Sequence, residues 1–383
     1  MEGKKSNLRT VLGGFPCLLV FFVIFGFLGS RMGLANMLNT LMKTAFDLLM
    51  NTVFYLMAIC VITGAIGKIF MEFGVVDMLE VLFRPLMKPI FNLPGVSSLG
   101  CVMTFLSDNP AIITLAKDKR FSRHFRTYQY ISLTNFGTAF GMGLLVIIYM
   151  ISQGFFKEPL IGFLGACCGC VVSTRLMQYF VLKAHPTYNT MMEIVYDESS
   201  EEDSMQKDSE KSLFTRILDA LLDGGKSGVE IGLAIIPGVL IISTFVMVFT
   251  FGPSAETGMY TGAAYEGVEA LPWLAQKLDF IFRWLFGFTD PHVIAFPITS
   301  LGAVGAALSL VPSFIEQHWM DGNAIAVCTA IGMCWSGFLS THTAMLDTIG
   351  HRDLTSKAIL SHTIGGVVAG ISAHVFYLLI SLL

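Results

Sequence analysis

A run of residues able to bind ions or polar ligands lies in the first half of the chain. Ser107, Asp108 and Asn109 are followed by Pro110, within an apolar stretch. A carboxylate in apolar surroundings is costly unless it meets a cation, a polar ligand or water, so Asp108 predicts a binding site. The alternative is a capped turn, because Ser, Asp and Asn are favoured N-caps and Pro suits the first helical position.

Two further polar residues, Thr134 and Asn135, open the apolar stretch that follows. Together with Ser107 they offer oxygen atoms of the kind that hold Na⁺ where a helix is unwound. Hydrogen bonding between packed helices is the alternative interpretation.

The second half contributes Ser309, Ser336, Thr341 and His342 as candidate solute-binding residues. His342 could carry a proton or donate a hydrogen bond to a solute. The alternative is a hydrogen-bonded histidine of the core. No other metal site is expected, and a coupling ion, Na⁺ or H⁺, is the one candidate cofactor.

Enzyme signatures are absent from the sequence, which has no phosphate loop, no H-E-x-x-H helix and no G-x-S-x-G elbow. The chain is therefore predicted not to be an enzyme. The cysteines Cys167, Cys168 and Cys170 cluster in an apolar run beside small residues, which favours helix packing over a metal or redox site.

The composition indicates an integral membrane protein. Hydrophobic residues make up 54% of the chain, charged residues only 14%, and the mean hydropathy is +0.68. The net charge of −4 indicates no nucleic-acid partner. The expected partners are a lipid bilayer and a small polar solute, and a homo-oligomer is left open.

We predict an all-α polytopic fold with seven spanning helices, at residues 11–30, 48–67, 131–156, 160–182, 231–251, 323–346 and 358–383.

Internal repetition organises these elements. LEVLFRPL at residues 79–86 recurs as LDFIFRWL at 278–285, and Ser-Leu-Gly at 98–100 recurs at 300–302. A serine and then a proline follow each tripeptide, ending at Pro110 and at Pro312. Anchors in the same order and at nearly constant separation predict a duplicated unit.

Each copy contains an amphipathic segment followed by an apolar stretch that is too short to cross a bilayer once and is broken in the middle by proline. Asp77, Glu80, Arg84 and Lys88 share one helical face, and Gln276, Asp279 and Arg283 repeat the pattern. These segments are predicted to lie at the membrane interface. Residues 95–116 and 293–319 are predicted to form re-entrant hairpins, with tips at 107–110 and 309–312.

Most of the 24 lysines and arginines fall on one side of the membrane if the basic N-terminus and residues 117–126 are cytoplasmic. This arrangement inverts the second copy relative to the first. It predicts a multi-pass protein of the bacterial inner (cytoplasmic) membrane with a cytoplasmic N-terminus. The expected domains are an N-terminal helix and connector (1–47), a first repeat (48–182), a polar cytoplasmic linker (183–228) and a second, inverted repeat (229–383).

Several short motifs carry a family resemblance. Residues 224–230, GGKSGVE, run into Ile-Ile-Pro at 235–237, while residues 65–70 read AIGKIF and 85–94 form a proline-bounded segment. Over residues 48–383 the chain resembles the Gate-domain (nucleoside recognition domain) proteins, including spore maturation proteins A and B. Its element order resembles the core of the concentrative nucleoside transporters. The resemblance implies a fold and leaves the solute open.

The sequence is compatible with two functions. The first is a secondary transporter of a small polar solute, nucleoside-like or another metabolite, with a midplane site formed by the two hairpins. The second is a non-transporting regulatory or structural membrane protein of the spore maturation type. Polar groups that converge in one pocket would favour the transporter.

Overall fold

The computed structural model describes residues 2–108, 110–192, 212–254 and 256–382. Within these ranges the chain is helical with a single isolated β-bridge, between Arg126 and Met191, so the expected all-α class is confirmed. The elements before the linker are α1 (Glu2–Met32), α2 (Leu34–Asp47), the π-helical turn η1 (Leu48–Val53), α3 (Phe54–Glu72), α4 (Val75–Leu86), the π-helical turn η2 (Met87–Phe91), α5 (Ser97–Leu106), α6 (Pro110–Lys117), α7 (Lys119–Ser122), α8 (Thr127–Thr138), α9 (Gly143–Ser152), α10 (Lys157–Ala184) and the 3₁₀ turn η3 (Pro186–Asn189).

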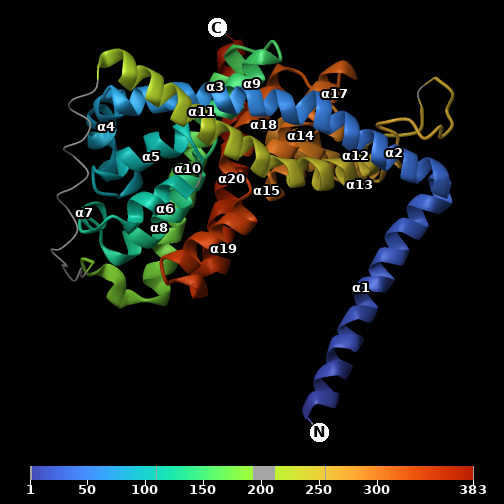
Figure 1. Ribbon diagram of the computed structural model, residues 1–383, viewed down its shortest axis with the longest axis horizontal. Helices are drawn as coiled ribbons and strands as arrows, with labels where there is room; N and C mark the ends of the chain where they lie inside the picture. The colour runs from blue at the N-terminus through green and yellow to red at the C-terminus, as the bar shows by residue number, and fades with distance from the viewer. Residues whose placement is uncertain (1, 109, 193–211, 255, 383) are drawn as a thin grey trace.

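The second half has a matching series of helices (Figure 1). Its elements are α11 (Leu213–Pro237), the π-helical turn η4 (Gly238–Ser243), α12 (Thr244–Thr250), α13 (Ala270–Lys277), α14 (Asp279–Phe286), the 3₁₀ turn η5 (Pro291–Ile294), α15 (Ala295–Gly302), α16 (Val304–Leu308), α17 (Val311–Glu316), α18 (Gly322–Cys334), α19 (Phe338–Thr348), the 3₁₀ turn η6 (Arg352–Leu354) and α20 (Thr355–Ser381).

The two halves present their elements in the same order. Each opens with a long helix that contains a π-helical turn, η1 or η4. An amphipathic segment follows, α4 in one half and α13–α14 in the other, and then a helical hairpin, α5–α6 or α15–α16. A broken helix comes next, α8–α9 or α18–α19, and a long unbroken helix closes each half, α10 or α20.

The opening helices α3 and α11 cross at glycines. A Cβ atom added at Gly64 would lie 2.5 Å from the Gly224 carbonyl oxygen, and one added at Gly228 would meet the backbone of Cys60. Gly228 lies further along α11 than Gly224, whereas Cys60 lies earlier along α3 than Gly64. The two helices therefore run antiparallel, with their backbones in direct contact.

The closing helices α10 and α20 repeat this arrangement. A Cβ atom at Gly169 would lie 2.5 Å from the Gly365 carbonyl oxygen, and one at Gly165 would lie 2.6 Å from that of Ala369. Small residues that allow close backbone approach are typical of helix pairs in membranes. Since corresponding helices of the two halves pair antiparallel, the halves run in opposite directions, as inverted repeats require.

Six helices among the described residues are long and apolar enough to cross a membrane: Gly14–Met32, Leu34–Glu72, Thr127–Ser152, Lys157–Ala184, Leu213–Thr250 and Arg352–Ser381. The seventh expected span, residues 323–346, forms two shorter helices, α18 and α19. Gly337 has a φ of 77° between them, a left-handed conformation that ends the helical path and that glycine adopts without strain.

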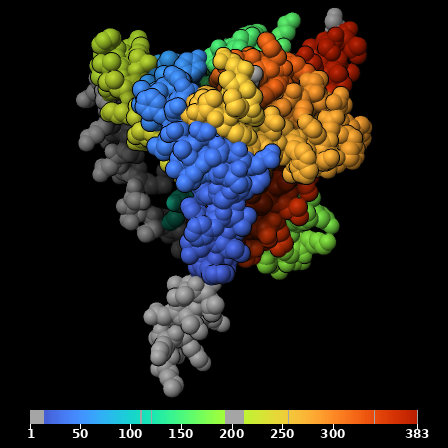
Figure 2. Space-filling model, turned by 90° about the vertical axis from the view of Figure 1, so that its right-hand side faces the viewer, coloured from blue at the N-terminus to red at the C-terminus, as the bar shows by residue number. Residues whose placement is uncertain are grey.

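The N-terminal helix α1 projects away from the rest of the molecule (Figure 1), and its part from Gly14 onwards lies at the front of the view in Figure 2. Its apolar side chains face outwards, with Phe15 67% and Val23 62% exposed, as expected of a helix surrounded by lipid. The connector expected before residue 48 is itself helical, since α2 continues through η1 into α3.

Part of the expected polar linker is also helical. Helix α11 begins at Leu213, where the Ser212 Oγ accepts a hydrogen bond from the Thr215 amide and caps the first turn. The acidic run of the linker, residues 197–203, lies outside the described residues.

The amphipathic helix α4 turns part of its charged face inwards. Glu80 is buried, accepts two hydrogen bonds from Arg84 and contacts Ser98 at the start of the first hairpin. Met78, Val81 and other apolar side chains of α4 are exposed. The Glu80 contacts therefore anchor the helix to the hairpin, while its apolar face is available to lipid.

Candidate functional site

The first hairpin is broken where the sequence predicts. Helix α5 ends at Leu106 and α6 begins at Pro110. Ser107 leaves the helical conformation and donates from its Oγ to the Met103 carbonyl at 2.6 Å. The two arms pack closely, because a Cβ at Gly100 would collide with Ile112. Asn109 lies outside the described residues.

The second hairpin breaks earlier than predicted. Helix α15 ends at Gly302, and Ala303 is extended, with φ −164° and ψ 123°. The expected tip around Ser309 is instead buried inside the molecule, where Ser309 Oγ donates to the Ala306 carbonyl. Pro312 occupies the first turn of α17, a position that tolerates proline, so it does not mark a chain reversal there.

Both broken helices turn at a left-handed residue. Met142, with φ 58°, precedes α9, and Gly337 precedes α19. The Gly337 amide donates to the Ser300 carbonyl at 3.2 Å. This contact ties the break in α18–α19 to the second hairpin.

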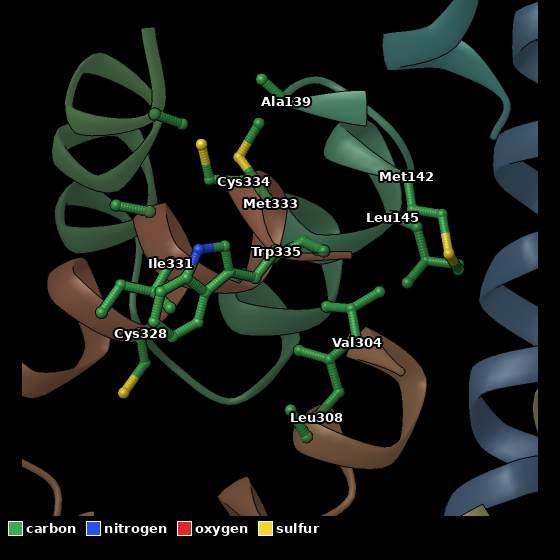
Figure 3. Packing of buried hydrophobic residues seen from close by; sticks show 14 of the residues in the cluster. Ala139, Met142, Leu145, Val304, Leu308, Cys328, Ile331, Met333, Cys334 and Trp335 are labelled. Carbon is green, nitrogen blue, oxygen red and sulfur yellow. The ribbon is translucent and has the colours of Figure 1, made fainter. Parts of the chain in front are cut away.

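The breaks of both hairpins and both broken helices meet at one cavity of about 340 Å³. Asp108 comes from the first hairpin, and Met142 from the α8–α9 turn. The remaining lining residues are Ile231, Ala234 and Ile235 of α11, Gly302 to Gly305 of the second hairpin, and Ser336, Gly337 and Thr341 at the α18–α19 break. Figure 3 shows the packed apolar side of this junction, where Met142, Val304 and Trp335 belong to one cluster of buried side chains.

Three of the predicted site residues, Asp108, Ser336 and Thr341, are thus brought together. Ser336 Oγ donates to the Thr138 carbonyl at 3.2 Å, and Thr341 Oγ1 donates to the Gly337 carbonyl at 2.9 Å. These bonds position both hydroxyl groups within the lining.

Thr134 and Asn135 lie away from the cavity lining, in a buried junction between α8, α10 and α20. The Asn135 amide nitrogen lies 3.0 Å from Ser173 Oγ, from Ser361 Oγ and from the Ala358 carbonyl oxygen. Thr134 Oγ1 donates to the Ile131 carbonyl and approaches the Asn135 side-chain oxygen. These contacts correspond to the interhelical hydrogen bonding that the sequence left as the alternative to a Na⁺ site.

A pair of buried histidines extends this junction. His362 Nε2 contacts the Cys334 carbonyl, which can only accept, so Nε2 carries the proton and Nδ1 accepts from Ser173 Oγ at 2.7 Å. His342 Nδ1 likewise donates to the Phe338 carbonyl at 3.1 Å. The two rings are 4.7 Å apart. His342 Nε2 is fully buried and has no hydrogen-bond partner among the described residues.

The sequence reasoning missed two amide clamps that join the amphipathic segments to the long helices. In the first half, Asn92 donates to Tyr128 and Gln178, while Gln129 donates to the Asn92 carbonyl. This fixes the left-handed residue Asn92, with φ 55°, that follows η2.

The second half has an equivalent clamp. Asn323 donates to the carbonyls of Phe286 and Gly287 and contacts His374 at 2.8 Å. Gly287, with φ 65°, ends α14. The available sequence signal was an amide residue in the first turn of the broken helix that follows each hairpin, Gln129 in α8 and Asn323 in α18.

The second hairpin's small residues, Gly302, Ala303 and Gly305, were also missed as site residues. The signal was present as a glycine- and alanine-rich run, which permits both a chain break and close packing against α11. A Cβ at Gly305 would lie 2.5 Å from Ile235. Within the described residues, no group of three His, Cys, Asp or Glu side chains is arranged to hold a metal.

No family model matches the chain. A sporulation integral membrane protein, YlbJ of Bacillus subtilis (strain 168), is 29% identical over 99 residues, which is 26% of this chain and 24% of that protein. The match thus spans about a quarter of the relative's length.

Among solved structures, the chain is similar to variants of CNTnw, a concentrative nucleoside transporter. A structure in an intermediate state has a TM-score of 0.55 at 12% identity and covers 97% of this chain and 86% of that one. A structure in an outward-facing state has a TM-score of 0.54 at 13% identity, with the same coverage. The resemblance predicted from the sequence is confirmed at the level of fold: the chain is a polytopic membrane protein with the architecture of a concentrative nucleoside transporter.

Proposed function

We propose that this chain is a secondary transporter that moves a small polar solute through the cavity between its two hairpins. The observation that carries the proposal is the convergence of four chain breaks on one cavity of about 340 Å³. Breaks at membrane depth are tolerated only where protein or water satisfies the freed backbone groups. A central cavity with a carboxylate and two hydroxyl groups is the site expected of such a transporter.

In this proposal Asp108, Ser336 and Thr341 contact the solute. Ser107 precedes Asp108 at the break, and Asn109, the next residue in the sequence, is proposed as a further solute-binding residue. Thr134, Asn135 and His342 hold the surrounding helices together, and Ser309 braces the second hairpin from behind. The chain has no enzymatic role, and Na⁺ or H⁺ supplies the driving gradient.

The proposed orientation follows the distribution of basic residues. The N-terminus and residues 117–126 face the cytoplasm of a bacterium, and residues 252–271 face the opposite side. The hairpins α5–α6 and α15–α16 then enter from opposite sides, as re-entrant elements of inverted Gate-like repeats do. The chain acts alone or as a homo-oligomer within the bilayer.

A second function is supported by the sporulation relative. A non-transporting membrane protein of the spore maturation type would keep the transporter architecture and use it as a structural or regulatory element. In that case the cavity would bind no solute.

The test is a binding screen followed by transport. The purified protein is screened for thermal stabilisation by nucleosides, nucleobases, amino acids and amines, each with and without Na⁺. A ligand at about 100 times its dissociation constant should stabilise the fold by roughly 2.7 kcal/mol. Any compound that stabilises the protein is then tested for uptake into proteoliposomes under a Na⁺ or a pH gradient.

Two variants connect the result to the cavity. Thr341→Trp fills the cavity and should abolish uptake, whereas Thr343→Trp, on the same helix but away from the lining, should retain it. Uptake that survives Thr341→Trp would exclude this cavity as the pathway. If no compound stabilises the protein or enters the vesicles, the non-transporting function is favoured.

A further inference from the structure

The charged side chains of the cavity lining have one sign. Among the described residues that line it, Asp108 is the one charged side chain, and Lys, Arg and His are absent. A carboxylate accepts hydrogen bonds and donates none when ionised. The charged part of the lining therefore offers only acceptors.

The Thr341 hydroxyl group is a further acceptor in the lining. The single proton of Thr341 Oγ1 is directed to the Gly337 carbonyl at 2.9 Å. A hydroxyl whose proton is used in this way presents its lone pairs. The Gly337 amide is used as well, since it donates to the Ser300 carbonyl.

Another part of the lining is apolar. Ile231 lies one turn before Ala234 and Ile235 on the same face of α11. Met142 adds an adaptable side chain. A cavity of about 340 Å³ lies near the lower end of the range for small-molecule sites, roughly 300–1,000 Å³.

We infer that the solute carries N–H donor groups, as an ammonium, an amidinium or an amino-substituted ring, which bind Asp108 and Thr341, and an apolar side that packs on α11. This inference rests on the proposed transport function and specifies its substrate class. An anionic group placed directly against the Asp108 carboxylate would be repelled, so the donor groups of the solute are assigned to this side of the cavity.

The experiment compares pairs of related compounds, one of which carries an amino group while the other carries a carboxylate or an oxo group in its place. Benzylamine is compared with benzoate, putrescine with succinate, and adenosine with inosine, which lacks the amino group. NaCl alone is a further arm, because Na⁺ also binds carboxylates. Binding is measured as thermal stabilisation and as protection of a Thr341→Cys variant from maleimide, with the unsubstituted protein as the background for native thiols.

The expected result is that at least one amine or amino-substituted ring protects position 341 and that its matched partner does not. Asp108→Asn should weaken that binding by about 10- to 100-fold, the effect of losing a hydrogen bond to a charged group. Thr341→Val, which removes the hydroxyl acceptor at constant shape, should weaken it by about 3- to 10-fold.

Each other outcome overturns a specific claim. Protection by benzoate or succinate, or amine binding unchanged in Asp108→Asn, overturns the donor class and leaves the transport function standing. Protection by Na⁺ alone, with no organic compound adding to it, makes Asp108 an ion site and overturns the solute assignment. If a folded protein is protected by no compound in any arm and transports none, the proposed function itself fails.

Discussion

Asn135 on α8 donates to Ser173 on α10 across 3.0 Å, in a part of the molecule from which solvent is excluded. Ser173 in turn donates to His362 on α20, whose own N–H reaches the Cys334 carbonyl. One chain of hydrogen bonds therefore connects a broken helix of the first half to the closing helices of both halves. Each of its members is hydrogen-bonded, which suits a rigid junction.

Asn135→Ala is expected to destabilise the protein by about 1–3 kcal/mol, because Ser173, Ser361 and the Ala358 carbonyl lose a buried donor. Thermal unfolding in detergent measures the loss. The exposed residue Asn51, which bonds only within its own helix, provides the control: Asn51→Ala should change stability by less than about 0.5 kcal/mol. A stable Asn135→Ala variant that no longer binds solute would instead make Asn135 a site residue.

Gly224→Ala is expected to destabilise the α3–α11 crossing by about 1–3 kcal/mol, since its new methyl group would collide with the backbone of Gly64. The neighbouring Gly225 is the matched control, because a Cβ there would lie 3.7 Å from Val61, an ordinary contact. Gly225→Ala should be neutral or stabilising by up to about 1 kcal/mol through helix propensity. Equal effects of the two substitutions would mean that the backbones do not touch at this crossing.

The loop before α20 is expected to make stability depend on pH. Burial lowers the pKa of His351 below its usual 6.5, and the neighbouring His185 lowers it further, while Asp353 acts in the opposite direction. The folded state therefore binds fewer protons at this residue than the unfolded state. The contribution is fully present above pH 6.5 and is lost as the pH falls from there towards the lowered pKa.

His351→Gln should remove this part of the pH dependence. The measurement compares unfolding temperatures at about pH 7.5 and pH 5.5 for the variant and the unsubstituted protein, with the exposed His124→Gln as a control. The variant should lose less stability on acidification than the unsubstituted protein does. An identical loss in both would place the pH dependence elsewhere.

The orientation in the membrane is testable by labelling from one side. Arg123 and Thr257 are both exposed, and they lie in the proposed cytoplasmic and external loops. In intact cells a maleimide that cannot cross the membrane should label Thr257→Cys but not Arg123→Cys, and both should react after lysis. Labelling of Arg123→Cys in intact cells would reverse the proposed orientation.

The architecture was largely predictable because it depends on composition and repetition. Long apolar runs identify spanning helices, and duplicated anchors reveal matched halves. The first hairpin break was found because Ser107 and Asp108 are favoured N-caps and precede Pro110, which suits the first turn of a new helix. The second was misplaced, because proline at the start of α17 is compatible with a continuing helical path, while the actual break at Ala303 carries no polar signal.

The candidate site was only partly predictable, because a polar residue in an apolar helix can face either a cavity or a neighbouring helix. Asp108 and Thr341 line the cavity, whereas Asn135 and His342 are turned into the packed interior. Neighbouring positions such as Thr341 and His342 point in different directions from one helix. Which direction reaches the cavity depends on α10, α11 and α20, elements distant in the sequence.

The glycine crossings have a consequence for the order in which the protein can assemble. Helix α3 packs on α11, and α10 packs on α20, so each long helix of the first half finds its partner only after a later part of the chain has been synthesised. Until then Gly64 and Gly169 face lipid, where small residues gain little from packing. A chain interrupted before α11 would therefore insert into the bilayer with α3 and α10 lacking their partner helices, and cellular quality control would encounter separate helices in place of a folded domain.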